Sequence, residues 1–186
     1  MPRYARTRLA ALLLAVLVTI LMSWGPAMTA DAAEIDRDAS AALALLYQTT
    51  PAAEQLAPQT KAILIFPSIV KAGFIVGAQR DEGALRKGGK TVAYYRMTAA
   101  SYGLQAGVQS FGYAMFFMTN AAVAYLEKSN GWEVGVGPSV VVVDEGMGRS
   151  LTTTTAKDDV YAFIFGQKGL MAGLGLQGSK ITQIDP

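Results

Sequence analysis

An alternation of glycine with apolar residues near the end of the chain constrains the fold more than any other feature. Residues 166–178 contain five glycines, and over residues 170–177 leucine or alanine occupies every second position. A period of two predicts a β-strand. Glycine leaves no side chain to pack, so within a strand it marks a bulge, a bend or the close approach of another backbone. We therefore expect this strand to lie directly against a neighbour.

The glycines divide the chain into two parts. All of them except Gly25 lie between Gly73 and Gly178. Before Gly73, apolar residues follow helical spacing, which predicts a first helix with Asp36 as N-cap and core positions at Ile35, Ala39, Ala42, Leu43 and Leu46. The sequence Thr50-Pro51 predicts the start of a second short helix, which Pro58 ends.

Short apolar or alternating runs predict the strands. We place them at residues 62–66, 71–78, 91–97, 102–109, 113–118, 132–143, 150–155, 161–165 and 170–177. Pro67 is expected to close the first strand. Residues 81–90 are expected to form a charged loop or hairpin with its turn at Gly88-Gly89.

One helix interrupts the strands. Residues 120–128 have helical spacing, with Thr119 or Asn120 as the cap and Asn130-Gly131 as the stop. The sequence thus predicts one α+β domain over residues 33–186. It has short N-terminal helices and a Gly-rich, strongly curved or barrel-like antiparallel sheet with one internal helix.

Residues 1–32 have the pattern of a secretory signal peptide. Arg3, Arg6 and Arg8 precede an apolar run at residues 9–22, and residues 30–32 read Ala-Asp-Ala, an A-x-A cleavage site. We expect cleavage near Ala32 and a periplasmic or secreted protein. An uncleaved anchor is the alternative, although the run is shorter than the roughly 20 residues that span a bilayer. Without cysteine, the protein is not expected to be a lipoprotein.

Charge and composition exclude several classes of function. The chain has 16 basic and 14 acidic residues, and without residues 1–32 the two numbers are equal, at 13 each. A broad basic surface for nucleic acid is therefore absent. The lack of histidine and cysteine excludes a Ser-His-Asp triad, histidine metal ligation and disulfides. Asp144 and Glu145 in a predicted turn are too few for a Ca²⁺ site. We expect no metal, no cofactor and no enzymatic activity.

Two groups of residues are candidates for ligand contact. A basic group lies within one short segment and could pair with phosphate oxygens of lipid headgroups: Lys71, Arg80, Arg86, Lys87 and Lys90. The alternative is a solvated hairpin. An apolar group could contact acyl chains, because methionine and aromatic side chains adapt to flexible ligands: Phe111, Tyr113, Phe116 and Met118. The alternative is that these residues are core.

Several long segments resemble a known family. KAILIFPSIVKAGFIVGAQ (61–79), the segment 98–155, DVYAFIFGQKGL (159–170) and KGLMAGLGLQGSKITQI (168–184) are similar to the bacterial branch of the SYLF domain family. The family includes yeast actin-patch proteins. The resemblance implies an α+β domain that binds lipid or a membrane surface without catalysis. In eukaryotic relatives, basic residues of the N-terminal helix are associated with phosphoinositide binding. Residues 33–60 depart from that pattern with one basic residue, Arg37.

The expected function is therefore that of a non-catalytic protein of the cell envelope that binds phospholipid or a membrane surface. The alternative is a protein–protein interaction or structural module of the envelope, in which an edge or face of the Gly-rich sheet binds a protein partner.

Overall fold

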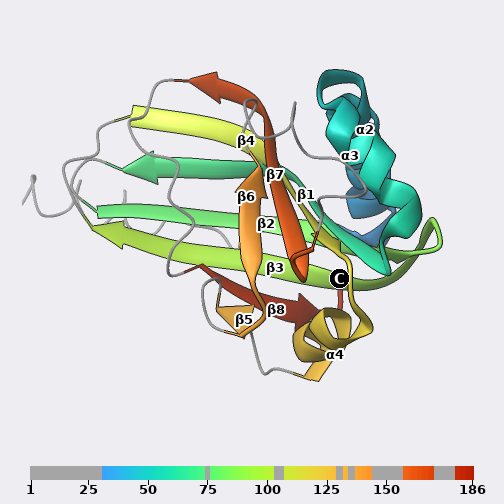
Figure 1. Ribbon diagram of the computed structural model, residues 1–186. Helices are drawn as coiled ribbons and strands as arrows, with labels where there is room; N and C mark the ends of the chain where they lie inside the picture. The colour runs from blue at the N-terminus through green and yellow to red at the C-terminus, as the bar shows by residue number, and fades with distance from the viewer. Residues whose placement is uncertain are drawn as a thin grey trace, which may run out of the picture.

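A computed structural model describes residues 31–73, 76–102, 107–128, 132–133, 137–143, 157–169 and 179–186. These residues form an eight-stranded sheet curled into a half-barrel (Figure 1). The strands are β1 (Ala62–Gly73), β2 (Val76–Lys87), β3 (Lys90–Tyr102), β4 (Gly107–Phe117), β5 (Trp132–Glu133), β6 (Val140–Val143), β7 (Val160–Gly169) and β8 (Lys180–Ile184). The predicted α+β class with a strongly curved sheet is confirmed.

The order of strands across the sheet is β5-β8-β3-β2-β1-β4-β7-β6. Every described pair is antiparallel except β6 and β7, which run parallel. β1 and β4 therefore occupy the centre. The region 132–143, predicted as a strand pair or one bent strand, instead forms β5 and β6 at opposite edges of the sheet.

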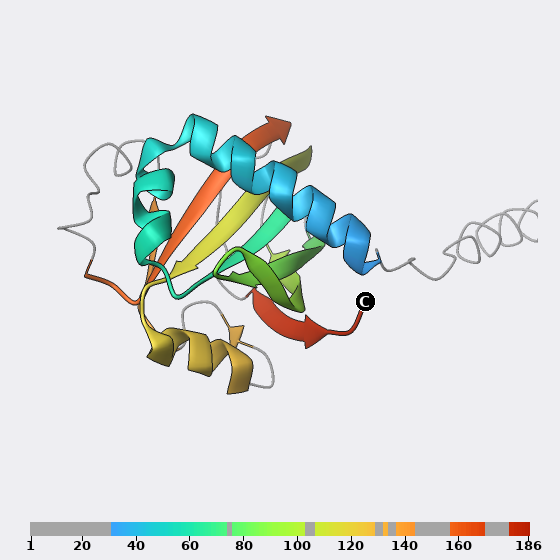
Figure 2. The same cartoon turned by 90° about the vertical axis from the view of Figure 1, so that its right-hand side faces the viewer.

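Helices cover both faces of this sheet. α2 (Ala32–Thr49), α3 (Pro51–Leu56) and the 3-10 turn η1 (Ala57–Gln59) precede β1, and α4 (Asn120–Lys128) follows β4. Figure 2 shows α2 crossing the strands on the convex, outer face, while α4 lies on the other side. The predicted bounds of α4 are confirmed, and Thr119 is its cap, because the Thr119 hydroxyl accepts a hydrogen bond from the Ala122 backbone N–H at 3.2 Å. Residues 130–131, the predicted stop, lie outside the described residues.

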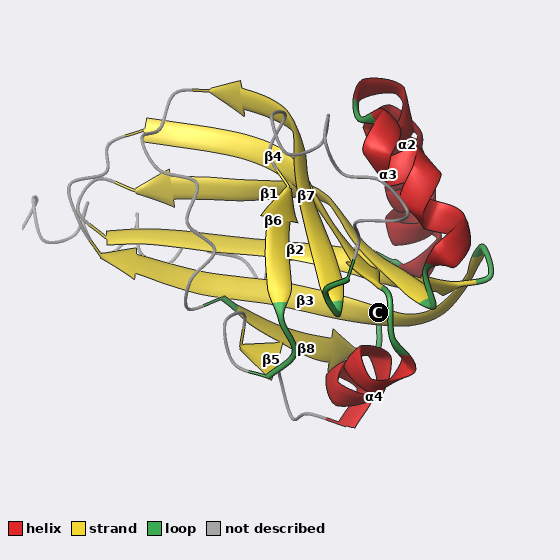
Figure 3. Ribbon diagram, viewed as in Figure 1, coloured by secondary structure: helices red, strands yellow, loops and turns green. Residues whose placement is uncertain are grey.

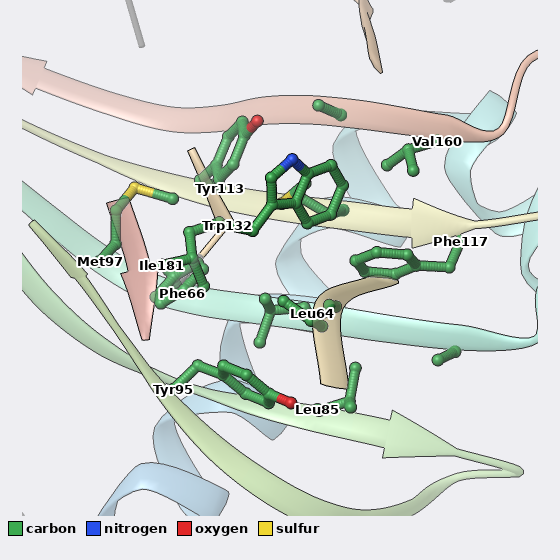
Figure 4. Packing of buried hydrophobic residues seen from close by; sticks show 14 of the residues in the cluster. Leu64, Phe66, Leu85, Tyr95, Met97, Tyr113, Phe117, Trp132, Val160 and Ile181 are labelled. Carbon is green, nitrogen blue, oxygen red and sulfur yellow. The ribbon is translucent and has the colours of Figure 1, made fainter. Parts of the chain in front are cut away.

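The two faces of the central strands build two separate cores. Alternate residues of β1, β4 and β7 point inward, where they pack with Trp132, Ile181 and α4 (Figure 4). The residues between them point outward and pack under α2 and α3. The inner core includes Leu64, Phe66, Leu85, Tyr95, Met97, Phe111, Tyr113, Met115, Phe117 and Val160, and the outer core includes Ile35, Ala39, Leu46, Leu56, Ile63, Ile65, Phe116, Tyr161 and Phe163.

The first strand is longer than predicted because a β-bulge accommodates its proline. The register of β1 against both neighbours shifts between Ile65 and Val70, around Pro67 and Ser68. Proline lacks the N–H that a regular ladder needs, and a bulge tolerates it. The expectation that Pro67 ends the strand was therefore wrong. Residues 81–87 likewise belong to β2, whereas the turn at Gly88-Gly89 is confirmed, with φ angles of 55° and 78°.

The first helix begins one turn earlier than predicted. Asp31 is its N-cap, with the side chain accepting from the Glu34 backbone N–H at 2.8 Å. Asp36 lies inside the helix, and its carboxylate accepts hydrogen bonds from Thr91 Oγ1 at 2.7 Å and Tyr94 Oη at 3.1 Å. The expectation that Asp36 caps the helix was wrong, and its actual role is to attach α2 to β3. The second helix starts at Pro51 as predicted.

We predict that replacing Gly83 by alanine destabilises the protein by about 2–3 kcal/mol, the upper range for overpacking. A Cβ atom at this position would lie 2.3 Å from the Ile65 carbonyl oxygen, beside the bulge of β1. Gly112→Ala is the matched control, because its Cβ would meet only the ring of Phe165, which can shift. Denaturant unfolding checks both variants. A loss for Gly83→Ala no larger than for Gly112→Ala would contradict this account.

We further predict that Asp36→Ala lowers the free energy of unfolding by about 1–3 kcal/mol, because two half-buried donors on β3 lose their acceptor. Asp38→Ala removes an exposed carboxylate two residues away and should stay within about 0.5 kcal/mol of the wild type. Urea unfolding of the two variants measures the difference. Equal stability of both would contradict the proposed attachment.

Candidate functional site

The strands extend beyond the helices at one end of the sheet. In Figure 3 the helices gather at one end of the long strands, while the opposite ends of β1–β4 carry no described helix. We call this the distal end and define it by the described residues 70–73, 76–80, 98–102, 107–110, 166–169 and 179–180. The opposite end, with α2, α3, α4 and the β2–β3 turn, is the helical end.

Four cations and no acid occupy the distal end as defined. The cations are Lys71, Arg80, Lys168 and Lys180. They come from four different strands, β1, β2, β7 and β8. Lys168 and Lys180 are exposed. The excess of positive charge among these residues favours negatively charged ligands.

Three of the four cations belong to one continuous row. Directly opposed residues of antiparallel neighbours share a face of the sheet, and the registers link β8, β3, β2, β1, β4 and β7. Adjacent strands lie about 4.8 Å apart, so the row spans about 24 Å. Its members are Lys180, Thr98, Arg80, Val70, Ser110 and Lys168.

The described members of this row are accessible. Thr98 is exposed, Val70 is 45% exposed and Ser110 is half-buried. Lys71 lies one residue beyond Val70 and is opposite Gln109 of β4. We call Lys71, Arg80, Lys168 and Lys180 together the cation belt.

Three described acids lie next to the cation belt: Asp81, Glu82 and Glu133. Glu82 is paired with Arg96, with Oε1 2.5 Å from Nη2, so its charge is compensated. Glu133 of β5 lies opposite Lys180 at the sheet edge. Asp81 follows Arg80 directly and lies opposite Met97, a residue of the inner core.

Asp81 is the acid with the most perturbed surroundings among the described residues. Burial, partly opposed by the hydrogen bond from the Ser68 backbone N–H at 3.0 Å, raises the pKa of Asp81 to about 7. The charges of Glu82 and Asp38 raise this pKa further. Near neutral pH, Asp81 is therefore only partly ionised, so its negative charge compensates the neighbouring cations of the belt only in part.

The basic residues predicted for headgroups divide between the two ends of the sheet. Lys71 and Arg80 lie at the distal end, but Lys87 is seven residues along β2 from Arg80, a distance of about 23 Å. Arg86 donates from Nη2 to the Asp36 carbonyl at 2.9 Å and to Ser40 Oγ at 2.7 Å, so it holds α2. Lys87 Nζ lies 2.5 Å from Glu127 Oε1 of α4. Lys90 is exposed at the turn.

The residues predicted for acyl chains divide between the two cores. Phe111 and Tyr113 point into the inner core, whereas Phe116 belongs to the outer core and stacks edge-on against Phe163 at 4.9 Å. Met118 follows the end of β4 and packs half-buried against the outer core. These side chains therefore do not line one common space, and the three aromatic ones are buried as core residues.

Polar atoms without partners occur inside the half-barrel. The hydroxyls of Tyr95 and Tyr113 and the Gln109 Oε1 atom are buried and have no hydrogen-bond partner in the part of the chain that the structure describes. Burial raises the pKa of Tyr95 to about 12 and that of Tyr113 as well, so both hydroxyls remain protonated at neutral pH. Figure 4 shows both rings among apolar side chains. Nothing in this arrangement provides a nucleophile with an adjacent base.

Within the described residues, no group of three or more acidic, histidine or cysteine side chains could hold a metal ion. The same part of the chain contains no helix long and apolar enough to cross a membrane. Asp144 and Glu145, the acids weighed as Ca²⁺ ligands, lie outside the described residues, as do the predicted strands at 150–155 and 170–177 and the glycine alternation itself.

A known family model matches the second half of the chain, which contains most of the strands. Residues 98–185 match the family model of Ysc84, described as "Las17-binding protein actin regulator". This segment is thus similar to a Ysc84-type, or SYLF, domain. The matched segment begins within β3 and includes β4 to β8, together with Lys168 and Lys180. No curated protein matches the chain. The family description names a binding protein.

The sequence analysis missed Lys168 and Lys180. They are 88 to 109 residues from Lys71 and Arg80 in the chain, and only the registers of β7 and β8 bring them into the same belt. The available signal was the absence of acids from residues 166–180, which becomes informative once those residues are placed beside β3 and β4.

We predict that Asp81 makes stability fall as the pH rises from about 4 to about 7. Because its pKa is raised in the folded protein, the folded state retains a proton that the unfolded state releases in this range. Asp81→Asn stays neutral and can still accept from Ser68. The variant should match the wild type near pH 4 and be more stable at pH 8. Denaturant unfolding at both pH values checks this, and a wild type that is the more stable protein at pH 8 would contradict it.

Proposed function

We propose that the protein is a non-catalytic module of the cell envelope that binds the surface of phospholipid membranes through its distal end. The observation that carries the proposal is the cation belt, in which four strands supply Lys71, Arg80, Lys168 and Lys180 to one end of the sheet, with Glu133 opposite Lys180 at the sheet edge. The resemblance of the chain to SYLF domains supports a binding role of this kind.

The charge distribution supports one orientation on an anionic surface. The helical end carries acidic residues on α2, including Glu34 and Asp38, both exposed. The same end also carries Arg86, Lys87, Lys90 and Lys128, so its charge is mixed, and an anionic membrane would attract the cation belt more strongly than this end. The protein is close to neutral without residues 1–32, so the asymmetry between the two ends, rather than net charge, provides the attraction.

The expected affinity of the belt alone is low. A lysine or arginine near an anionic leaflet contributes about 1 kcal/mol. Four such residues contribute about 4 kcal/mol, which corresponds to a dissociation constant in the millimolar range. Binding by charge alone should therefore be weak, and salt should reduce it, because the Debye length falls to about 3 Å at 1 M salt.

Vesicle flotation of residues 33–186, the predicted mature chain, tests the proposal. We expect binding to phosphatidylglycerol vesicles that exceeds binding to phosphatidylcholine vesicles and that high salt weakens. The double variant Lys168→Gln, Lys180→Gln should bind phosphatidylglycerol roughly 30-fold more weakly, which corresponds to about 2 kcal/mol. Both lysines are exposed, so the fold should be unaffected.

The matched control is the double variant Lys90→Gln, Lys128→Gln, which removes the same charge from exposed positions at the helical end. It should bind as the wild type does. Equal losses of vesicle binding in both double variants would show that net charge alone determines binding, and would contradict the proposal that the distal end is the binding surface. Absence of binding to every vesicle would contradict the proposal and favour a protein partner for the Gly-rich sheet.

A further inference from the structure

A half-buried carboxylate, Asp81, lies directly beside the cation belt. Asp81 follows Arg80 in β2 and is opposite Met97 of β3, which in turn is opposite Ile181 of β8. Met97 and Ile181 are buried in the inner core. Asp81 is therefore a charged residue aligned with apolar core positions, and the row next to it contains Lys180 of the belt.

The bulge of β1 provides the polar partner of this carboxylate. The register of β1 against β2 shifts between Ile65 and Val70, and within this stretch the Ser68 backbone N–H donates to Asp81 Oδ2 at 3.0 Å. Residues 62–70 of β1 carry no charged side chain. The bulge thus orients the carboxylate through a neutral hydrogen bond and supplies no cation that would neutralise it.

Asp81 forms no ion pair among the described residues. Two cations close to it are engaged by other acids. Arg96 of β3 pairs with Glu82, and Arg37 of α2 pairs with Asp38 at 3.2 Å. The positive charges that an ionised Asp81 would oppose are therefore those of the neighbouring belt.

The charge of Asp81 changes near neutral pH. Burial, to which the charges of Glu82 and Asp38 add, raises the pKa of Asp81 to about 7, although hydrogen bonds from the Ser68 and Glu82 backbones oppose the rise. The chain contains no histidine and no cysteine, the side chains that commonly titrate in this range. A rise in pH through neutrality therefore adds a negative charge beside the belt.

We propose that Asp81 is a proton switch of the cation belt: protonated, it leaves the belt free for an anionic membrane surface, and ionised, it weakens that contact. The inference rests on the proposed function and adds the regulation of the same surface. Attachment is stronger in mildly acidic than in mildly alkaline surroundings. By linkage, binding to an anionic surface in turn strengthens the hold of Asp81 on its proton.

Flotation of residues 33–186 with phosphatidylglycerol vesicles at pH 6 and pH 8, at one low ionic strength, tests the inference. One charge near an anionic leaflet changes binding about fivefold, so the wild type should bind about three- to fivefold more weakly at pH 8. Asp81→Asn should bind equally at both pH values, at the wild-type level of pH 6. Any contribution from the terminal amine is common to both proteins. Circular dichroism at each pH establishes that both are folded.

Glu133→Gln is the matched control, because it removes an exposed acid opposite Lys180 and leaves Asp81 in place. This variant should bind more tightly at both pH values and keep the wild-type ratio between them. Equal binding of the wild type at both pH values, or an unchanged pH dependence in Asp81→Asn, would overturn the inference and leave the proposed function standing. Failure of the folded wild type to bind the vesicles at either pH would overturn both.

Discussion

The burial of β1 and β4 on both faces is the constraint on which the rest of the structure depends. Leu64 and Phe66 of β1 point into the half-barrel, while Ile63 and Ile65 point out, and all four are buried. Full burial of one such side chain stabilises the fold by about 1.5–3 kcal/mol, so neither face can remain in water. The outer face therefore requires α2 and α3, and the inner face requires α4, β5 and the curl of the sheet.

This burial on both faces also explains which part of the sheet is available for binding. The described core positions of β1 and β4 end at Ile69 and Phe111, and the cation belt lies beyond them. The distal end is thus the part of the sheet that the two cores do not need. Neither core cluster of described residues includes a member of the cation belt, which makes this end the candidate for binding.

The sequence predicted correctly those elements that are determined by residues adjacent in the chain. The helix at 120–128 was placed correctly, because its neighbours in the chain determine its capping. The apolar run at 113–118 forms the second half of β4, whose first residues had been predicted as part of a separate strand at 102–109. Pro67 was misinterpreted, since a bulge that retains the strand depends on Asp81 and Gly83 of the next strand. Asp36 was misinterpreted as a cap because its partners, Thr91 and Tyr94, are more than 50 residues away.

The candidate site was less predictable than the fold for the same reason. A cluster of basic residues in one segment suggested a single patch. Because β2 is long, Arg86 and Lys87 instead lie at the helical end. There Arg86 donates hydrogen bonds to Asp36 and Ser40, and Lys87 pairs with Glu127. Lys168 and Lys180 could be assigned to the belt only from cross-strand register. Such pairing is a property of the assembled sheet.

Hydrogen–deuterium exchange of the full chain, free and bound to phosphatidylglycerol vesicles, tests the central claim most directly. The claim is that one end of the sheet meets the membrane. The account predicts added protection in peptides covering residues 76–80 and 98–102, and unchanged exchange in α2 and at the turn of residues 87–90. Protection confined to α2 or to that turn would contradict it.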